Sequence, residues 1–238
     1  MATFNGARFL EAQIDSILEQ LEPFDELVVS DDGSTDATPE ILARYGQRIR
    51  VVGMTGVGGV VPNFERALSA ARGDLIALSD QDDVWLAGRA ALIRDRLRHS
   101  TLLMMNGVVV DEALTPTGRT VYELVGSHSG FLRTLLANSY VGCCMAFRCE
   151  VLDLSLPFPA RIAAHDWFIA LVAERLFDVE RSDRPTMLYR RHGSNASTTG
   201  GRSGSGLWTK LASRWWMMLA VAATVHRNAQ RRARCKRN

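Results

Sequence analysis

Two short apolar segments, each followed at once by acidic residues, constrain this fold most. Residues 27–29 lead into Asp31 and Asp32, and residues 75–78 lead into Asp80, Asp82 and Asp83. Short apolar segments of this kind indicate buried strands, and the carboxyl ends of parallel strands meet at one sheet edge. Clustered carboxylates repel one another and lose hydration, so this edge is expected to hold a cation or a donor-rich ligand.

Strand-like and helix-like segments alternate along the first hundred residues. This alternation predicts an α/β domain with a Rossmann-like, doubly wound and mostly parallel sheet that carries helices on both faces. The chain has 238 residues, of which 47% are hydrophobic, enough for one sizeable core. The expected strands are 26–30, 49–52, 74–78, 102–110, 143–147 and 186–189. The expected helices are 9–21, 38–45, 63–71, 130–137 and 165–176, with Thr38 as the cap of the second.

The sequence also suggests boundaries. Residues 1–199 are expected to form the main domain, 200–206 a Gly/Ser-rich linker, and 207–238 a helical appendage with a basic tail. Only residues 1–4 precede the Asn5-Gly6 turn, so the first strand is expected to be truncated. The N-terminus has neither a basic nor an apolar leader, which predicts a cytoplasmic protein. The four cysteines form no CxxC pair, so neither zinc nor a disulfide framework is predicted.

A third acidic position, Asp166, follows His165 and precedes Trp167. Each acidic group also has an ordinary structural interpretation. Asp31 to Asp36 is a common turn sequence, the run that begins at Asp80 fits an acidic loop, and Asp166 suits a helix N-terminus. Their order along one chain favours a shared site.

Together these motifs resemble family 2 glycosyltransferases of the GT-A fold, on the rhamnosyltransferase-like branch. Residues 1–6 resemble the end of that family's first strand, and 29–36 its nucleotide-binding turn. Residues 56–64 are similar to its glycine loop and the helix that follows, and 79–85 to its metal-binding DxD region. Residues 165–167 occupy the place of its base motif, and 189–195 resemble a late motif. The resemblance covers about residues 1–200.

The resemblance implies an inverting, metal-dependent glycosyltransferase of cell-envelope polysaccharide biosynthesis. It would move a sugar from a nucleotide-diphosphate donor to a glycan or lipid-linked acceptor, with dTDP-rhamnose favoured and UDP- or GDP-sugars open. Asp166 would be the catalytic base. Mg²⁺ or Mn²⁺ would be held by Asp82, Asp80 and His192, although a lone histidine is also commonly structural. The implied nucleotide-binding residues are Thr3, Asn5, Asp31, Asp32, Asp80 and Arg191.

Two other functions remain open from the sequence. A sugar nucleotidyltransferase would keep the nucleotide site, but its usual glycine-rich basic phosphate loop is reduced here to residues 5–8. A catalytically inactive nucleotide-sugar-binding or scaffold protein would keep the fold without turnover. Trp85 and Trp167 fit either a sugar pocket or the core.

The C-terminal segment combines an apolar stretch with a basic one. Residues 215–225 are apolar except Thr224, which at 1.5 Å per residue is roughly 16 Å and too short to span a bilayer. The last twelve residues hold six basic side chains and no acid, so the rest of the chain carries a net charge of −4. This pattern fits peripheral contact with an anionic membrane at the inner face of the cytoplasmic membrane. It equally fits packing on the domain or a partner, and nucleic-acid binding is not predicted.

Overall fold

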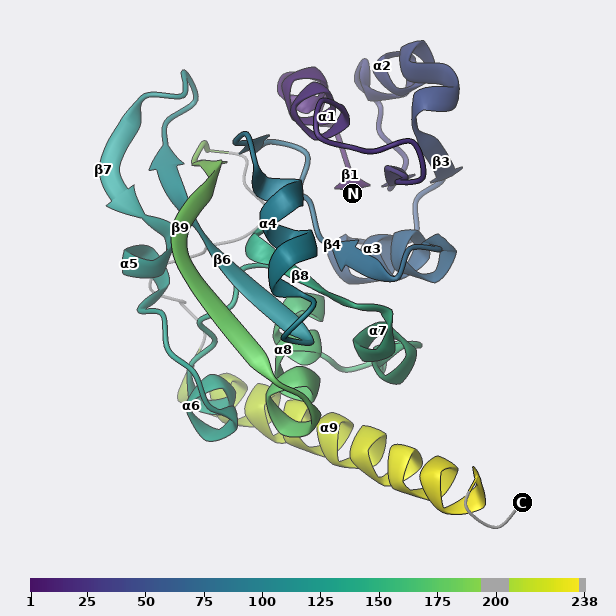
Figure 1. Ribbon diagram of the computed structural model, residues 1–238, viewed down its shortest axis with the longest axis vertical. Helices are drawn as coiled ribbons and strands as arrows, with labels where there is room; N and C mark the ends of the chain where they lie inside the picture. The colour runs from purple at the N-terminus through teal and green to yellow at the C-terminus, as the bar shows by residue number, and fades with distance from the viewer. Residues whose placement is uncertain (194–205, 236–238) are drawn as a thin grey trace.

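The computed structural model of the protein describes residues 1–193 and 206–235 (Figure 1). Ser194 and Asn195 of the late motif lie outside the described residues, as does the predicted linker apart from Gly206. The architecture is the predicted α/β fold, with strands in two sheets, helices on both sides, and a long C-terminal helix.

The first sheet contains three parallel strands in the order β1-β2-β3. Its strands are β1 (Ala2–Thr3), β2 (Val28–Asp31) and β3 (Arg50–Gly53), and the helices between and after them are α1 (Leu10–Leu18), α2 (Thr38–Tyr45) and α3 (Val60–Ala70). The predicted alternation is therefore confirmed here. The cap of α2 differs from the prediction, because the Asp36 carboxylate accepts the Thr38 N–H at 3.0 Å while the Thr38 hydroxyl accepts the Gly6 N–H.

The second sheet has six strands in the order β4-β8-β6-β9-β5, with β7 paired to β6. These are β4 (Leu75–Ala77), β5 (Val84–Trp85), β6 (Leu102–Val110), β7 (Pro116–Thr120), β8 (Met145–Arg148) and β9 (Val179–Arg190). Only β6 and β9 pair in parallel. The expectation of a mostly parallel sheet is thus right for the first sheet and wrong for the second, because β6 turns directly back into β7 and β8 runs against both its neighbours.

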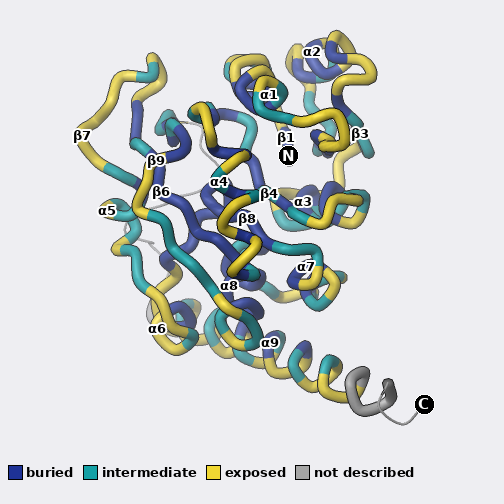
Figure 2. Tube along the Cα trace, in the orientation of Figure 1, coloured by how far each residue is buried: buried dark blue, intermediate teal, exposed yellow. Residues whose placement is uncertain are grey.

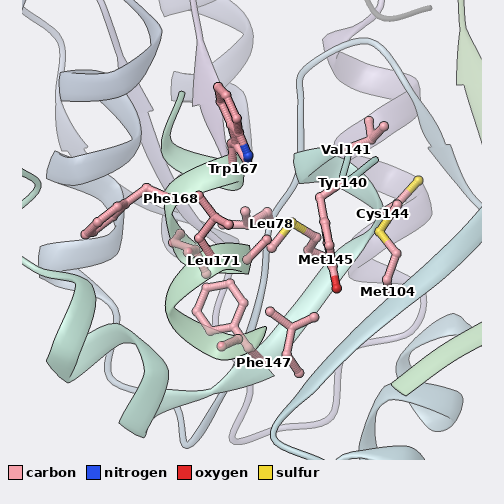
Figure 3. Packing of buried hydrophobic residues seen from close by; sticks show 14 of the residues in the cluster. Leu78, Met104, Tyr140, Val141, Cys144, Met145, Phe147, Trp167, Phe168 and Leu171 are labelled. Carbon is pink, nitrogen blue, oxygen red and sulfur yellow. The ribbon is translucent and has the colours of Figure 1, made fainter. Parts of the chain in front are cut away.

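The remaining helices surround this second sheet. They are α4 (Arg89–Arg96), α5 (Val121–Val125), α6 (Phe131–Leu136), α7 (Cys149–Ser155), α8 (His165–Leu176) and α9 (Leu207–Cys235), with short 3-10 turns η1 (Gly46–Arg48) and η2 (Gly142–Cys144). The main core lies between α8 and the strands β6 and β8, which are the most buried part of the chain (Figure 2). Phe147 from β8 and Leu171 from α8 meet there (Figure 3). Because α8 is apolar on nearly every side from Trp167 to Ala173, it can only be a buried helix.

The N-terminus lies inside the protein. The Met1 ammonium donates to the Val28 carbonyl at 2.7 Å, and burial lowers the pKa of this ammonium to about 5. A cavity of about 610 Å³, lined largely by apolar side chains such as Leu27 and Ile76, lies beside the first residues of β1, β2 and β4. The predicted site residues do not line this cavity.

The helix α9 packs across α6, α7 and α8 at one end of the molecule (Figure 1). Met217 and Val221 on its inner face are buried and join the main core. None of the described helices is both long enough and apolar enough to cross a membrane.

Candidate active site

The carboxylates predicted from the three motifs converge on one edge of the fold. Asp80 follows β4, and Asp166 lies in the first turn of α8. Burial, together with the negative charges of Asp82 and Asp166, raises the pKa of Asp80 to about 7. Asp80 nonetheless keeps partial exposure at the surface. The structure therefore brings these three predicted residues together in one acidic cluster.

Asp82 is held in a defined orientation by two residues that follow β9 or end it. Its Oδ2 atom lies 2.8 Å from His192 Nε2, and both side chains are largely buried. The Arg190 Nε donates to the Asp82 carbonyl at 2.7 Å. The His192 ring also packs on Phe9, with 4.8 Å between ring centroids. Asp82 and His192, both expected to bind the metal, therefore lie in contact, and their role as ligands stays a prediction.

Asp83 is 1% exposed and lies behind Asp82. Its Oδ1 accepts the Arg190 N–H at 3.0 Å, whereas its Oδ2 is buried with no hydrogen-bond partner among the described residues. One ligand atom each from Asp80, Asp83 and Cys143 lies within 4.8 Å of the others. Burial, with the charges of Asp82 and Asp80, raises the pKa of Asp83 well above its ordinary value. An orphaned carboxylate oxygen among like charges fits an oxygen-seeking divalent cation.

Arg89 supplies a positive charge behind this acidic group. It is fully buried and donates to the Thr186 hydroxyl at 2.8 Å and to the Cys143 carbonyl at 2.6 Å. Its guanidinium also lies 4.8 Å from the centre of the Trp85 ring. Trp85 is thus a buried residue that lines the apolar cavity beside β1, β2 and β4 and is not part of the acidic cluster.

Asp31 organises the turn after β2. Its carboxylate accepts the N–H groups of Gly33 and Ser34 at 3.1 and 2.8 Å, the Ser34 hydroxyl, and the Thr3 hydroxyl at 3.2 Å. The structure thus assigns the oxygens of Asp31 to the turn, and Thr3 is a buried partner of that turn. Their predicted contact with a nucleotide stays a prediction.

Asp32 holds the glycine loop that precedes α3. Its carboxylate accepts the N–H groups of Val57, Gly58 and Gly59, the last at 2.7 Å. Burial raises the pKa of Asp32, but these backbone donors outweigh it and the net shift is downward. Arg66 of α3 fixes the same loop, because it donates to the Thr55 carbonyl at 2.8 Å and to the carbonyl of Asp31. Asp32 lies at the predicted place, with its oxygens directed to the loop.

Asn5 and Gln81 connect the first strand to the other motifs. The Asn5 Oδ1 accepts the Thr35 N–H at 2.9 Å, and the Asn5 N–H donates to the Ser34 hydroxyl. The Gln81 amide pairs with both backbone groups of Phe4, accepting its N–H at 2.8 Å and donating to its carbonyl at 3.0 Å. Gln81 therefore joins the end of β1 to the acidic loop after β4.

Asp166 is positioned at the N-terminus of α8. Its Oδ2 accepts the Gly142 N–H at 3.1 Å. The neighbouring His165 is buried and stacks on Phe64 with 4.0 Å between ring centroids, and burial lowers its pKa. His165 is therefore neutral at pH 7, and its ring is buried against Phe64. Asp166 is thus the candidate base of this motif. Trp167 donates through Nε1 to the Thr134 carbonyl at 2.8 Å and belongs to the core.

Four site residues were missed by sequence reasoning: Arg66, Gln81, Cys143 and Arg190. Gln81 lies inside the acidic motif and Arg190 lies beside the predicted Arg191, so their positions gave a signal. Arg66 and Cys143 gave none, because their partners are distant in sequence. Arg191 follows β9, where its N–H donates to the Val110 carbonyl at 2.9 Å. Its contact with a diphosphate stays a prediction.

Comparison with known sequences identifies relatives of the whole region. Residues 1–155 match the profile of the family described as glycosyl transferase family 2. The chain is 30% identical over 212 residues to the dTDP-rhamnosyl transferase RfbG of Shigella flexneri, covering 82% of this chain and 72% of the relative. It is 28% identical over 144 residues to an Escherichia coli UDP-Glc:alpha-D-GlcNAc-diphosphoundecaprenol beta-1,3-glucosyltransferase, WfgD, covering 60% of this chain and 56% of that one.

Comparison with solved structures shows the same fold at low sequence identity. The S. aureus TarS 1-349 structure in complex with UDP-GlcNAc superposes with a TM-score of 0.66 at 20% identity, over 94% of this chain and 64% of that chain. The mannosyltransferase PcManGT of Pyrobaculum calidifontis, in complex with GDP-Man and Mn²⁺, gives 0.58 at 18% identity, over 96% and 73%. The chain thus spans less than two thirds of the TarS structure.

Proposed function

The chain belongs to glycosyl transferase family 2, and we propose that it is an inverting, metal-dependent enzyme that uses a nucleotide-diphosphate sugar. The observation that carries the proposal is the acidic cluster, in which the charges of Asp82 and Asp166 add to burial in raising the pKa of Asp80. Such a cluster binds a cation favourably, because the cation offsets the repulsion between the carboxylates. The bound cation can in turn hold phosphate groups. A purely structural acidic loop would be expected to lie in solvent.

The proposed metal-binding residues are Asp82, Asp80 and His192. Of these, Asp80 has a ligand atom within 4.8 Å of those of Asp83 and Cys143, and its carboxylate and the orphaned Asp83 Oδ2 suit Mg²⁺ or Mn²⁺, which prefer oxygen ligands. When bound, the ion would neutralise charge on the departing nucleoside diphosphate. Mn²⁺ in the complex of the archaeal mannosyltransferase supports this choice of ion.

The proposed nucleotide-binding groups are Thr3, Asn5, Asp31, Asp32, Asp80 and Arg191. Asp31 would act by fixing the turn, and Asp32 would act through the glycine loop that its carboxylate holds. Arg191 would contact the diphosphate, because a guanidinium matches the geometry of phosphate oxygens. The donor to test first is dTDP-rhamnose, given the Shigella flexneri relative, with UDP-sugars next.

Asp166 would be the catalytic base. Inversion at the anomeric carbon requires a group on the face opposite the leaving group, where it takes the proton of the acceptor hydroxyl as that oxygen attacks. The Gly142 N–H and the start of α8 hold the carboxylate in one orientation. The C–O bond to the acceptor forms as the bond to the diphosphate breaks.

The proposed acceptor is a cell-envelope glycan or a lipid-linked sugar. The name of the Escherichia coli relative gives an undecaprenol-linked acceptor, which supports a lipid-linked substrate. Such work would be done by a cytoplasmic enzyme in peripheral contact with the inner face of the membrane. The residues 1–199 would form the catalytic domain and 207–238 its appendage.

The test is a panel of dTDP-, UDP- and GDP-sugars with Mn²⁺, Mg²⁺ or EDTA. We measure the thermal shift on donor binding and the release of nucleoside diphosphate with and without glycan and lipid-linked acceptors. We expect one donor to bind and turn over only with the metal. Donor binding without turnover for any acceptor would instead support the inactive binding protein.

A further inference from the structure

The helix α9 is apolar on two opposite faces. Its inner face carries Met217 and Val221, which are buried in the main core. At 3.6 residues per turn, the opposite face from 208 to 223 holds Trp208, Leu211, Ala212, Trp215, Leu219 and Ala222. The side chains on this outer face are exposed, Trp208 at 83% and Trp215 at 56%. A helix packed on a domain and otherwise in water would carry polar residues there.

The exposed apolar surface continues onto the neighbouring helix. Leu132 and Leu136 of α6 are 70% and 63% exposed. The two helices are joined where Arg214 donates to the Leu136 carbonyl at 2.8 Å through Nε. The exposed stretch of α9 and α6 lies together at one end of the molecule (Figures 1 and 2). Large exposed apolar side chains on two packed helices mark an interaction site.

We propose that the outer face of α9, with α6 beside it, docks on an anionic lipid bilayer. Tryptophan is the residue enriched at membrane–water interfaces, and three of the five tryptophans of the chain lie exposed on this helix. No described helix can cross a membrane, so α9 lies in the plane of the interface. From Trp208 to Leu219 the apolar face is roughly 17 Å long.

The charges around this face select the bilayer over a second copy of the chain. The last acidic residue of the sequence is Asp183, whereas α6 and the described part of α9 carry Arg133, Lys210, Arg214 and Arg227. A two-fold dimer through this face would place like charges opposite one another with no acid of α6 or α9 to pair with them. Anionic headgroups complement those charges, and the basic residues from 231 onward add to the attraction.

The test uses the full chain with vesicles of phosphatidylcholine alone and with phosphatidylglycerol added as the anionic lipid. We measure vesicle co-flotation and the shift of tryptophan emission. The variant is Trp208→Ser with Trp215→Ser. The matched control is Phe24→Ser, which removes a fully exposed aromatic side chain from the loop between α1 and β2.

We expect the wild type and Phe24→Ser to float with the anionic vesicles and to shift their emission to the blue. The double variant should lose at least tenfold in vesicle affinity, with unchanged melting temperature and unchanged donor binding. Unimpaired flotation of the double variant would overturn the proposal, as would a wild type that ignores anionic vesicles. A dimer that the double variant disrupts, without vesicle binding, would assign the face to self-association and overturn it too.

Discussion

Replacing Asp80 with asparagine should stabilise the metal-free protein, and more strongly at high pH than at low pH. Burial and the charges of Asp82 and Asp166 raise the pKa of Asp80 from 3.8 to about 7 in the folded protein. The folded state therefore holds this proton more tightly than the unfolded state does. Between pH 4 and 7 the unfolded state releases the proton first, so the free energy of unfolding falls as the pH rises through this window.

The size of the effect follows from about 1.4 kcal/mol for each pH unit. The charged Asp80 would cost up to about 4 kcal/mol above pH 7, and its partial exposure reduces this figure. At pH 5 the cost is smaller by about 3 kcal/mol, because the folded carboxyl is then protonated. The Asp80→Asn gain should thus be up to about 3 kcal/mol larger at pH 8 than at pH 5, or roughly 6–12 °C in melting temperature for a chain of this size.

The assay is thermal or urea unfolding at pH 5 and pH 8, with EDTA and with about 1 mM Mn²⁺. This concentration is chosen to occupy even a weak metal site. Mn²⁺ should raise the melting temperature of the wild type more at pH 8, since the cation must displace the Asp80 proton at pH 5. Asp153→Asn is the control, because Asp153 is an exposed acid on α7. An Asp80→Asn gain that is equal at pH 5 and pH 8 would refute the reasoning.

Three further predictions test other contacts. Asp166→Asn should keep donor affinity, measured by thermal shift, and lower transfer by about 10²–10⁴-fold, while Asp153→Asn transfers normally. Normal transfer by the Asp166 variant would reject it as the base. His192→Ala should weaken Mn²⁺ affinity by about 10–100-fold in calorimetric titration, and an unchanged affinity would make His192 structural. Gln81→Ala removes two hydrogen bonds to Phe4 and should cost about 1–3 kcal/mol in urea unfolding; an unchanged midpoint would show that the link contributes nothing.

The sequence predicted the elements whose signals are local. The strand predicted at 26–30 is observed at 28–31, and the helix predicted at 38–45 is observed there; both are bounded by turn residues and carry a clear apolar pattern. In β9 only 186–189 was predicted, whereas the strand begins at Val179. Its first half is charged and half-exposed, and it is a strand because it pairs in parallel with β6. The edge strand β7 was missed for the same reason, since Pro116–Thr120 has no apolar alternation.

The site was predictable at the level of motifs but not of contacts. The sequence could place acidic residues at strand ends, which is why Asp80, Asp82 and Asp166 were expected together. It could not show that the Asp32 carboxylate would accept hydrogen bonds from the glycine loop, because the donors lie 25–27 residues away in the sequence. A turn of this kind has the same sequence whether its carboxylate binds a ligand or fixes a loop.

The twelve-residue strand β9 connects the end of the molecule that carries α9 with the candidate active site. It starts at Val179, near the end of the molecule where α9 lies, and runs to Arg190, which holds the acidic loop (Figure 1). Twelve extended residues have a contour length of about 40 Å, and the curvature of β9 makes the end-to-end distance shorter (Figure 1). If α9 rests on the bilayer, sugar transfer takes place above the headgroups. A lipid-linked acceptor would then have to present its sugar above the headgroups, so transfer should increase with the length of the linkage or glycan that separates the accepting sugar from its lipid.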